Sequence, residues 1–214
     1  MADKTADWIT VLEGLEAVRR RPVMYIGAED GHPSRRARLL ELAVTDIAWE
    51  WRPQQVRILL WREDAVTIAY DGRPLPIEPC ARPIDDIPYP ALYWSFMHLH
   101  TPAVNGMAVL NALSERLVVS TMHDGRRYRG VFSKGMIASL LHCVHCDCPL
   151  GTTWLTYRPD ATIVAGEVLT PRDVHGIPER VALNMHVIAE RFGLNTEGVR
   201  IRVEDRMTED ADWD

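Results

Sequence analysis

Residues 106–132 read GMAVLNALSERLVVSTMHDGRRYRGVF and contain the change of pattern that decides the fold class. The first part, Gly106 to Ser114, is apolar and rich in alanine, which predicts a buried helix. Two strand-like runs follow, Arg116–Met122 and Arg127–Phe132, and the Asp124-Gly125 pair between them is typical of a hairpin turn. A buried helix that leads into an antiparallel hairpin predicts an α+β domain.

The stretches on either side continue the mixture of helices and strands. Apolar residues recur at helical spacing over Ile9–Arg21, where Pro22 ends the helix, and Ser34 is placed to cap a second helix, Arg35–Trp51. The remaining predicted helices are Ala91–His100 and Pro178–Arg191, and the remaining predicted strands are Val56–Trp61, Ala65–Ala69, Leu140–Cys146, Thr152–Tyr157 and Val199–Val203. This order predicts a mostly antiparallel sheet with helices on one face.

Composition narrows the class of protein. The chain has 214 residues, 47% of them apolar, which is enough for one sizeable domain with a core. A net charge of −6 gives no general electrostatic reason to expect direct nucleic-acid binding. We find no signal peptide and no apolar run of membrane-spanning length, and four cysteines do not suggest a secreted disulfide scaffold. We therefore expect a reduced, cytoplasmic protein without a membrane association.

Four further segments point to a family. They are ITVLEGLEAVRRRPVMYIG (residues 9–27), NALSERLVVSTMHDGRRYRGVFSKG (111–135), GTTWLTYRPD (151–160) and RFGLNTEGVRIRVEDR (191–206). In this order they resemble the N-terminal ATPase domain of DNA gyrase B and its counterpart, the E subunit of topoisomerase IV. The resemblance implies a GHKL-type two-layer sandwich, with helices on one face of a mostly antiparallel, eight-stranded mixed sheet.

The resemblance also implies a division of the chain into three parts. Residues 1–8 correspond to the arm through which the family dimerises, residues 9–206 to a degenerate ATPase domain, and residues 207–214 to an acidic tail that we expect to be disordered. Because the chain ends where the family's ATPase domain ends, we expect a stand-alone protein without transducer, DNA-cleavage or topoisomerase activity.

The catalytic helix of the family has a glutamate as general base and, four residues later, an asparagine that binds Mg²⁺. The matching residues here are Glu41 and Thr45, which the spacing places on one helix face. A threonine hydroxyl supplies one neutral oxygen in place of an amide. Asp46 follows directly, but it points about 100° away around the helix and is not expected to substitute.

The stretch Tyr70-Asp71-Gly72-Arg73-Pro74 matches the family's adenine-binding turn. Tyr70 stands where the family has the aspartate that accepts the adenine amino hydrogen, and Pro74 replaces a glycine that lets the backbone approach the nucleotide. Losing the charged acceptor costs about 2–4 kcal/mol of binding free energy. Asp71, Gly72 and Arg73 are retained.

The loop that cradles the phosphates in the family is also altered. Its glycines are replaced by the sequence TPAVN, and Gly106 is the residue that matches. Thr152 matches the threonine of the family's Gly-Thr pair. With three of four nucleotide elements changed, we expect neither ATP nor Mg²⁺ as a cofactor.

Two other groups of residues leave alternatives open. Trp49 and Trp94 flank the family's nucleotide pocket and either pack in the core or line an aromatic pocket or interface. Cys143, His145, Cys146 and Cys148 could hold zinc, but a regular strand sends them to different faces, so ordinary strand packing is the alternative.

Three functions remain in competition. The leading hypothesis is a non-catalytic homologue that acts by protein binding, as a homodimer or with a partner such as a gyrase-type subunit. The second is a refitted pocket that binds or transforms a different small molecule, with Glu41 as acid or base. The third is weak residual ATP binding or hydrolysis.

Overall fold

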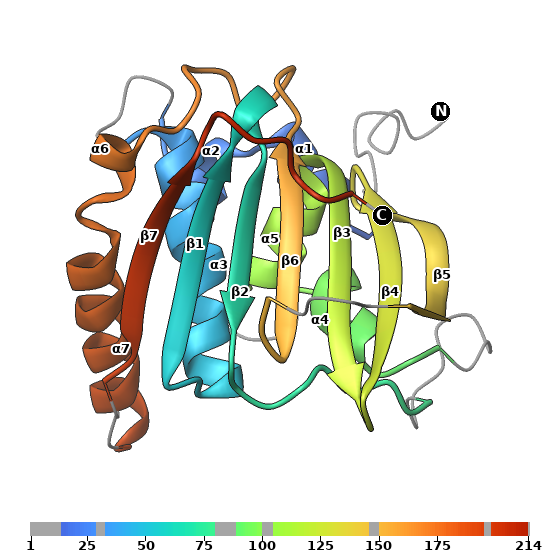
Figure 1. Ribbon diagram of the computed structural model, residues 1–214. Helices are drawn as coiled ribbons and strands as arrows, with labels where there is room; N and C mark the ends of the chain where they lie inside the picture. Colours follow the sequence, from blue (N-terminus) through green and yellow to red (C-terminus); the bar gives the residue numbers. More distant parts are fainter. Residues whose placement is uncertain are drawn as a thin grey trace, which may run out of the picture.

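The computed structural model describes residues 14–28, 33–79, 89–99, 105–145, 150–194 and 198–213, and these form two layers (Figure 1). One layer is a mixed sheet of seven strands in the order β5-β4-β3-β6-β2-β1-β7. The strands are β1 (Gln55–Trp61), β2 (Val66–Tyr70), β3 (Ser114–His123), β4 (Arg126–Ser133), β5 (Met136–Val144), β6 (Thr153–Pro159) and β7 (Arg200–Arg206). Strands β1 and β7 run parallel, and the other neighbouring strands run antiparallel.

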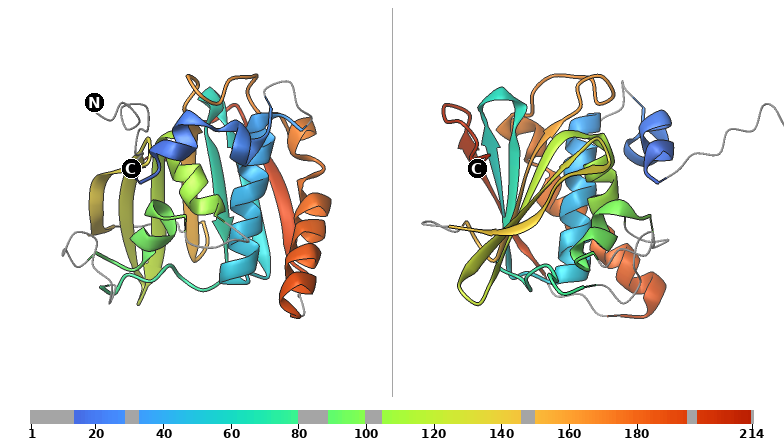
Figure 2. Two further views of the ribbon diagram at one scale, coloured as in Figure 1. Left: turned by 180° about the vertical axis from the view of Figure 1, so that it is seen from behind. Right: turned by 90° about the vertical axis from the view of Figure 1, so that its right-hand side faces the viewer.

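The second layer consists of helices that cover one face of the sheet (Figure 2). They are α1 (Glu16–Arg20), α2 (Val23–Ile26), α3 (Arg35–Trp51), α4 (Leu92–Met97), α5 (Gly106–Leu113), α6 (Pro171–Val174) and α7 (Ile177–Phe192), and a short 3₁₀ turn η1 (Arg62–Asp64) joins β1 to β2. Helix α3 lies between α5 and α7 and packs against both. The main core lies between the two layers. None of the helices in the described ranges has the length and apolar character needed to span a membrane.

The central predictions from sequence are confirmed. The Ser34 hydroxyl accepts a hydrogen bond from the Ala37 N–H at 3.3 Å, so it caps α3 as expected. The helix ends at Trp51, and Arg52 follows with a left-handed backbone (φ 45°). The hairpin turn between β3 and β4 has positive φ at both Asp124 and Gly125, as a type I′ turn requires.

Some boundaries differ from the sequence-based expectation. The sheet has seven strands in the described residues, where the resemblance implied eight. Strand β5 begins at Met136 rather than Leu140, because the Lys134-Gly135 pair, both with positive φ, turns the chain directly back from β4. The predicted first helix is present as α1 from Glu16, while residues 9–13 lie outside the described ranges.

The C-terminal segment also differs from the expectation of a disordered tail. Residues 207–213 continue from β7 and cross the sheet on the face opposite the helices (Figure 1, Figure 2). Trp213 and Ala211 pack there against a small apolar cluster formed by Leu59, Trp61 and Trp154. An acidic composition predicts disorder only when nothing holds the segment, and here the sheet provides both an apolar cluster and cations.

Candidate functional site

Three buried side chains form a row across the sheet on the helix-covered face. Tyr70 of β2 pairs with Thr153 of β6, and Thr153 pairs with Thr121 of β3. The two threonine hydroxyls are 3.0 Å apart, and that of Thr121 accepts a hydrogen bond from the Leu75 N–H at 3.0 Å. Tyr70 is only 2% exposed. Its ring therefore fills the position that the resemblance assigns to the adenine contact.

Asp46 lies beside this row, at the N-terminus of α5. Its Oδ2 accepts a hydrogen bond from the Met107 N–H at 2.8 Å, and the backbone N–H of Gly106 also donates to it. Free N–H groups and the positive end of the helix dipole make a helix N-terminus a place where anions bind. The resemblance assigns this place to the polyphosphate, and here the protein's own carboxyl group occupies it.

The pKa values of the cluster formed by Asp46, Tyr70, Thr121 and Thr153 reflect its burial. Burial raises the pKa of Asp46 from 3.8 to about 7, Glu50 adds to the rise, and the N–H groups of α5 oppose it. Burial likewise raises the pKa of Tyr70, whose hydroxyl lies near Thr153 and feels the charge of Asp46. The Asp46 carboxyl group therefore holds its proton more tightly than an exposed aspartate does, in a site from which water is largely excluded.

Gly106 brings the two helices of the site together. A Cβ atom at this position would lie 2.2 Å from the Leu42 carbonyl oxygen of α3 and 2.9 Å from the Asp46 Cβ. Real side chains do not tolerate such a distance to backbone, so only glycine allows this approach. Gly106 is therefore explained by helix packing alone.

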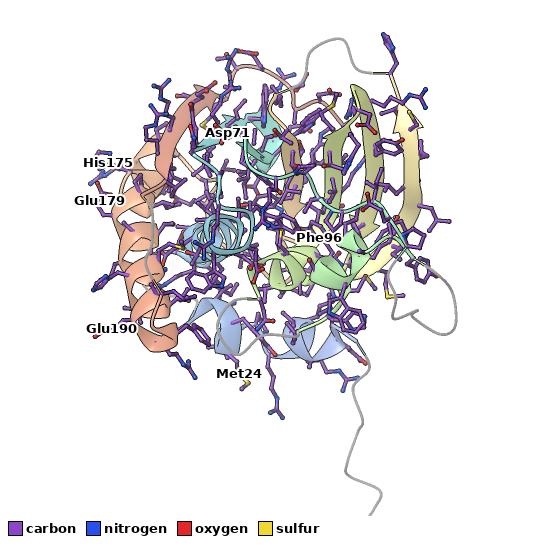
Figure 3. The ribbon with its side chains drawn as sticks, turned by 90° about the horizontal axis from the view of Figure 1, so that it is seen from below. Met24, Asp71, Phe96, His175, Glu179 and Glu190 are labelled. Carbon is purple, nitrogen blue, oxygen red and sulfur yellow. The ribbon has the colours of Figure 1, made fainter. Side chains whose placement is uncertain are left out.

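The retained residues of the turn after β2 hold it against the end of α3. Asp71 Oδ1 accepts a hydrogen bond from the Gln55 N–H at 2.9 Å, and Arg73 donates to the Glu50 carbonyl at 2.9 Å. A Cβ atom at Gly72 would lie 2.7 Å from the Trp51 carbonyl oxygen. Pro74 is half-buried in this turn. Figure 3 shows Asp71 at the end of β2.

Glu41 and Thr45 share a helix face, as their spacing predicts, but that face is turned toward α7. Glu41 is buried, and its Oε2 accepts a hydrogen bond from Arg180 Nε at 2.6 Å. Asn184 donates to Glu41 Oε1 at 3.1 Å and to Thr45 Oγ1 at 3.4 Å. Asp46 points to a different side of the helix from Glu41 and Thr45, as expected, and that side is the one that hydrogen-bonds to α5.

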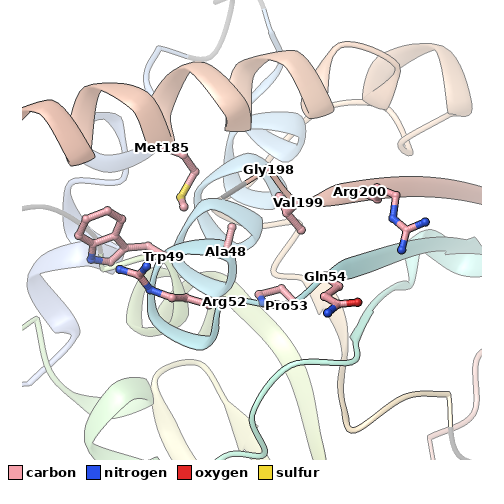
Figure 4. A pocket seen from close by; sticks show the side chains of 9 residues that line it. All are labelled: Ala48, Trp49, Arg52, Pro53, Gln54, Met185, Gly198, Val199 and Arg200. Carbon is pink, nitrogen blue, oxygen red and sulfur yellow. The ribbon is translucent and has the colours of Figure 1, made fainter. Parts of the chain in front are cut away.

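The two tryptophans lie in separate places. Trp49 is 6.0 Å from the Phe192 ring of α7 and lines a cavity of about 300 Å³ with Arg52 and Met185 (Figure 4). Trp94 lies on α4 and stacks on His98, with ring centroids 4.1 Å apart.

The remaining predicted site residues lie at the edges of the site or beyond it. Thr152 is half-buried and bonds through its backbone to Tyr70 and Met122, so Thr153 is the threonine that faces the cluster. Cys143 is exposed on β5, and Cys146 and Cys148 lie outside the described residues. Within the described ranges, no group of three or more His, Cys, Asp or Glu side chains could hold a metal ion.

Thr121 and Thr153 of the cluster were missed in the sequence, and Asp46 was considered but set aside, although signals exist for Thr153 and Asp46. Thr153 alternates with Leu155 and Tyr157, two residues that a strand must turn toward the core. Asp46 interrupts the apolar face of a helix, and a carboxyl group at such a position needs a hydrogen-bond donor.

Comparison with known proteins finds relatives over most of the chain. The chain is 31% identical over 171 residues to the B subunit of type 2 topoisomerase from Aquifex aeolicus, covering 74% of this chain and 21% of that protein. It is 29% identical over 196 residues to DNA gyrase B of Thermus thermophilus, covering 83% and 30% respectively. The chain thus spans less than a third of these relatives. No model of a known protein family matches it.

Among solved structures, the fold matches the 43K ATPase domain of Thermus thermophilus gyrase B in complex with an aminocoumarin. The TM-score is 0.68 at 26% identity, and the match covers 92% of this chain and 50% of that one. Sequence and fold agree over most of the described residues. The chain is therefore a homologue of the ATPase domains of gyrase B and of the B subunit of topoisomerase IV, with their GHKL-type α+β fold.

Proposed function

We propose that this protein is a non-catalytic homologue of the gyrase B ATPase domain and acts by binding protein, as a homodimer or with a partner such as a gyrase-type subunit. The observation that carries the proposal is the Asp46 carboxyl group, which accepts hydrogen bonds from the α5 N-terminus that a nucleotide phosphate would need. An internal carboxyl group at this place excludes a phosphate by occupancy and repels it by charge.

The residues present do not fit ATP and Mg²⁺. Tyr70 is a bulky, buried side chain in place of an acceptor for the adenine amino group. Glu41 is buried in an ion pair with Arg180, so its carboxylate is not free to take a proton from water. Thr45 bonds to Asn184 on the same side of α3. We derive no reaction step from these residues.

Calorimetry with a non-hydrolysable ATP analogue and Mg²⁺ tests the proposal. We expect no binding with a dissociation constant below about 1 mM. A gyrase B ATPase domain under the same conditions serves as the positive control. The variant Tyr70→Asp should also fail to bind, because Asp46 still covers the α5 N-terminus. Micromolar, Mg²⁺-dependent binding by the wild type would refute the proposal and favour residual ATPase function.

A second candidate function is favoured by the cavity beside Trp49. An indole ring, the Met185 side chain and the guanidinium groups of Arg52 and Arg200 line this space of about 300 Å³ (Figure 4). That chemistry suits a small planar anion, so the refitted-pocket hypothesis would use Trp49 and leave Glu41 without a role.

A further inference from the structure

The sheet face opposite the helices is rich in arginine, although the chain as a whole has a net charge of −6. Strand alternation places these side chains on the same face as the cluster of Trp61 and Trp154. The arginines that point to this face from the strands include Arg57, Arg116, Arg127, Arg129, Arg158, Arg202 and Arg206. Glu204 neutralises part of this charge through Arg57, at 2.6 Å.

Residues 209–213 lie on this face. Their N-terminal end is held by hydrogen bonds from Arg62 to a backbone carbonyl and to a carboxylate. The Arg62 N–H donates to the Glu209 carbonyl at 3.0 Å. The Arg62 guanidinium donates to both oxygens of Asp210, at 2.8 Å and 2.5 Å. Such a two-point contact between guanidinium and carboxylate fixes orientation as well as position.

The other end of the segment is held by an aromatic residue. The guanidinium carbons of Arg116 and Arg158 lie 5.2 Å and 5.4 Å from the Trp213 ring centroid. Arg116 donates to the Trp213 carbonyl oxygen at 3.2 Å, and Arg129 also donates to that oxygen. An aromatic ring contacted by two cations is an anchor of the kind found at the centre of interfaces.

These contacts are weak one by one but are aided by the covalent connection. Exposed ion pairs each contribute little to stability, and the Arg62–Asp210 pair is exposed. A short tether gives the segment an effective concentration of roughly millimolar, so millimolar affinity suffices for it to occupy the face. A separate chain with the same chemistry, and a larger contact area, can therefore displace it.

We propose that the arginine face, defined by Arg62, Arg116, Arg129 and Arg158, is a docking surface for an acidic segment of another protein that contains an aromatic residue. Residues 209–213 occupy this surface within the same chain, as a tethered ligand. The proposal rests on the protein-binding function proposed above and names the kind of partner.

The test uses the full chain and a fluorescent peptide with the sequence of residues 207–214, MTEDADWD. The double variant Asp210→Ala/Trp213→Ala removes both anchors of the internal segment and should bind the peptide at least tenfold more tightly than the wild type. Adding Arg116→Ala and Arg129→Ala to this variant should weaken binding at least tenfold. Adding Arg172→Ala, an exposed arginine on α6 in the helix layer (Figure 2), is the matched control and should leave binding unchanged.

Three results would overturn the proposal. The first is equal affinity of the peptide for the wild type and for the Asp210→Ala/Trp213→Ala variant. The second is equal affinity of that variant for the peptide and for a peptide with alanine in place of tryptophan. The third is tighter binding of an oligothymidylate than of a peptide with equal charge. The last would assign the face to nucleic acid. The two experiments test different claims. Because no nucleotide is present in the peptide assay, a failure to bind the peptide would not affect the proposal that the protein does not bind ATP. Likewise, ATP binding in calorimetry would not affect the result of the peptide assay.

Discussion

At the scale of the residue, Asp46 determines how the candidate site behaves. It stands on α3, hydrogen-bonds to the N-terminus of α5 and lies near Tyr70. The same carboxyl group accepts hydrogen bonds from the α5 N-terminus, which the proposal takes as the closed anion position, and links the two helices. A residue with both effects cannot be changed without altering stability and ligand access together.

The pH dependence of the free energy of unfolding should show that the pKa of Asp46 is raised in the folded protein. Its pKa is 3.8 when exposed and about 7 in the fold, so unfolding releases a proton between those values. The free energy of unfolding should therefore fall as pH rises through this window, by about 1.4 kcal/mol for each pKa unit of difference, and level off above pH 7. Asp46→Asn should lack this slope and gain stability relative to the wild type toward about pH 8.

Urea denaturation at about pH 4.5, 6 and 8 measures this difference. Parallel pH profiles for the two proteins would show that the Asp46 carboxyl group titrates in the fold as it does in the unfolded chain. The pKa argument would then be wrong, although the hydrogen bond to Met107 could remain.

At the scale of the element, the contact between α3 and α5 depends on one glycine. Gly106→Ala places a methyl group against the Leu42 carbonyl, 2.2 Å away, and should cost about 3 kcal/mol or more. Gly198→Ala is the matched control, because a methyl group there meets no atom within 4 Å and the backbone is not left-handed. Thermal unfolding of both variants compares them, and equal melting temperatures would contradict the packing account.

The ion pair between α3 and α7 gives a second prediction at this scale. Glu41→Gln leaves the half-buried Arg180 without its carboxylate partner and should lower the free energy of unfolding by about 2–3 kcal/mol. Glu179→Gln changes an exposed carboxylate on the outer side of α7 and should have little effect (Figure 3). Urea denaturation compares the two variants. If Glu41→Gln instead leaves stability unchanged and abolishes an ATPase activity, Glu41 is catalytic.

At the scale of the whole molecule, the sequence predicted the layers and nearly every element. The Ser34 cap of α3 and the β-rich runs of β1 and β2 follow from local chemistry, and the resemblance supplied the arrangement. The phase of α3 could not be predicted, because a rotation of about 100° decides whether Thr45 or Asp46 faces α5, and that rotation depends on how Arg180 and Asn184 pack. The place of residues 207–213 could not be predicted either, since it depends on arginines from three separate strands and a turn.

The parallel pair of β1 and β7 has a consequence for synthesis of the chain. Residues 55–61 pair with residues 200–206, so one edge of β1 has no partner until the ribosome has made nearly the whole domain. Contacts between residues so far apart in sequence form slowly, because a long loop must close first. A nascent chain arrested before Arg200 therefore exposes the apolar strand Gln55–Trp61 along that edge, and is the form of this protein most in need of a chaperone.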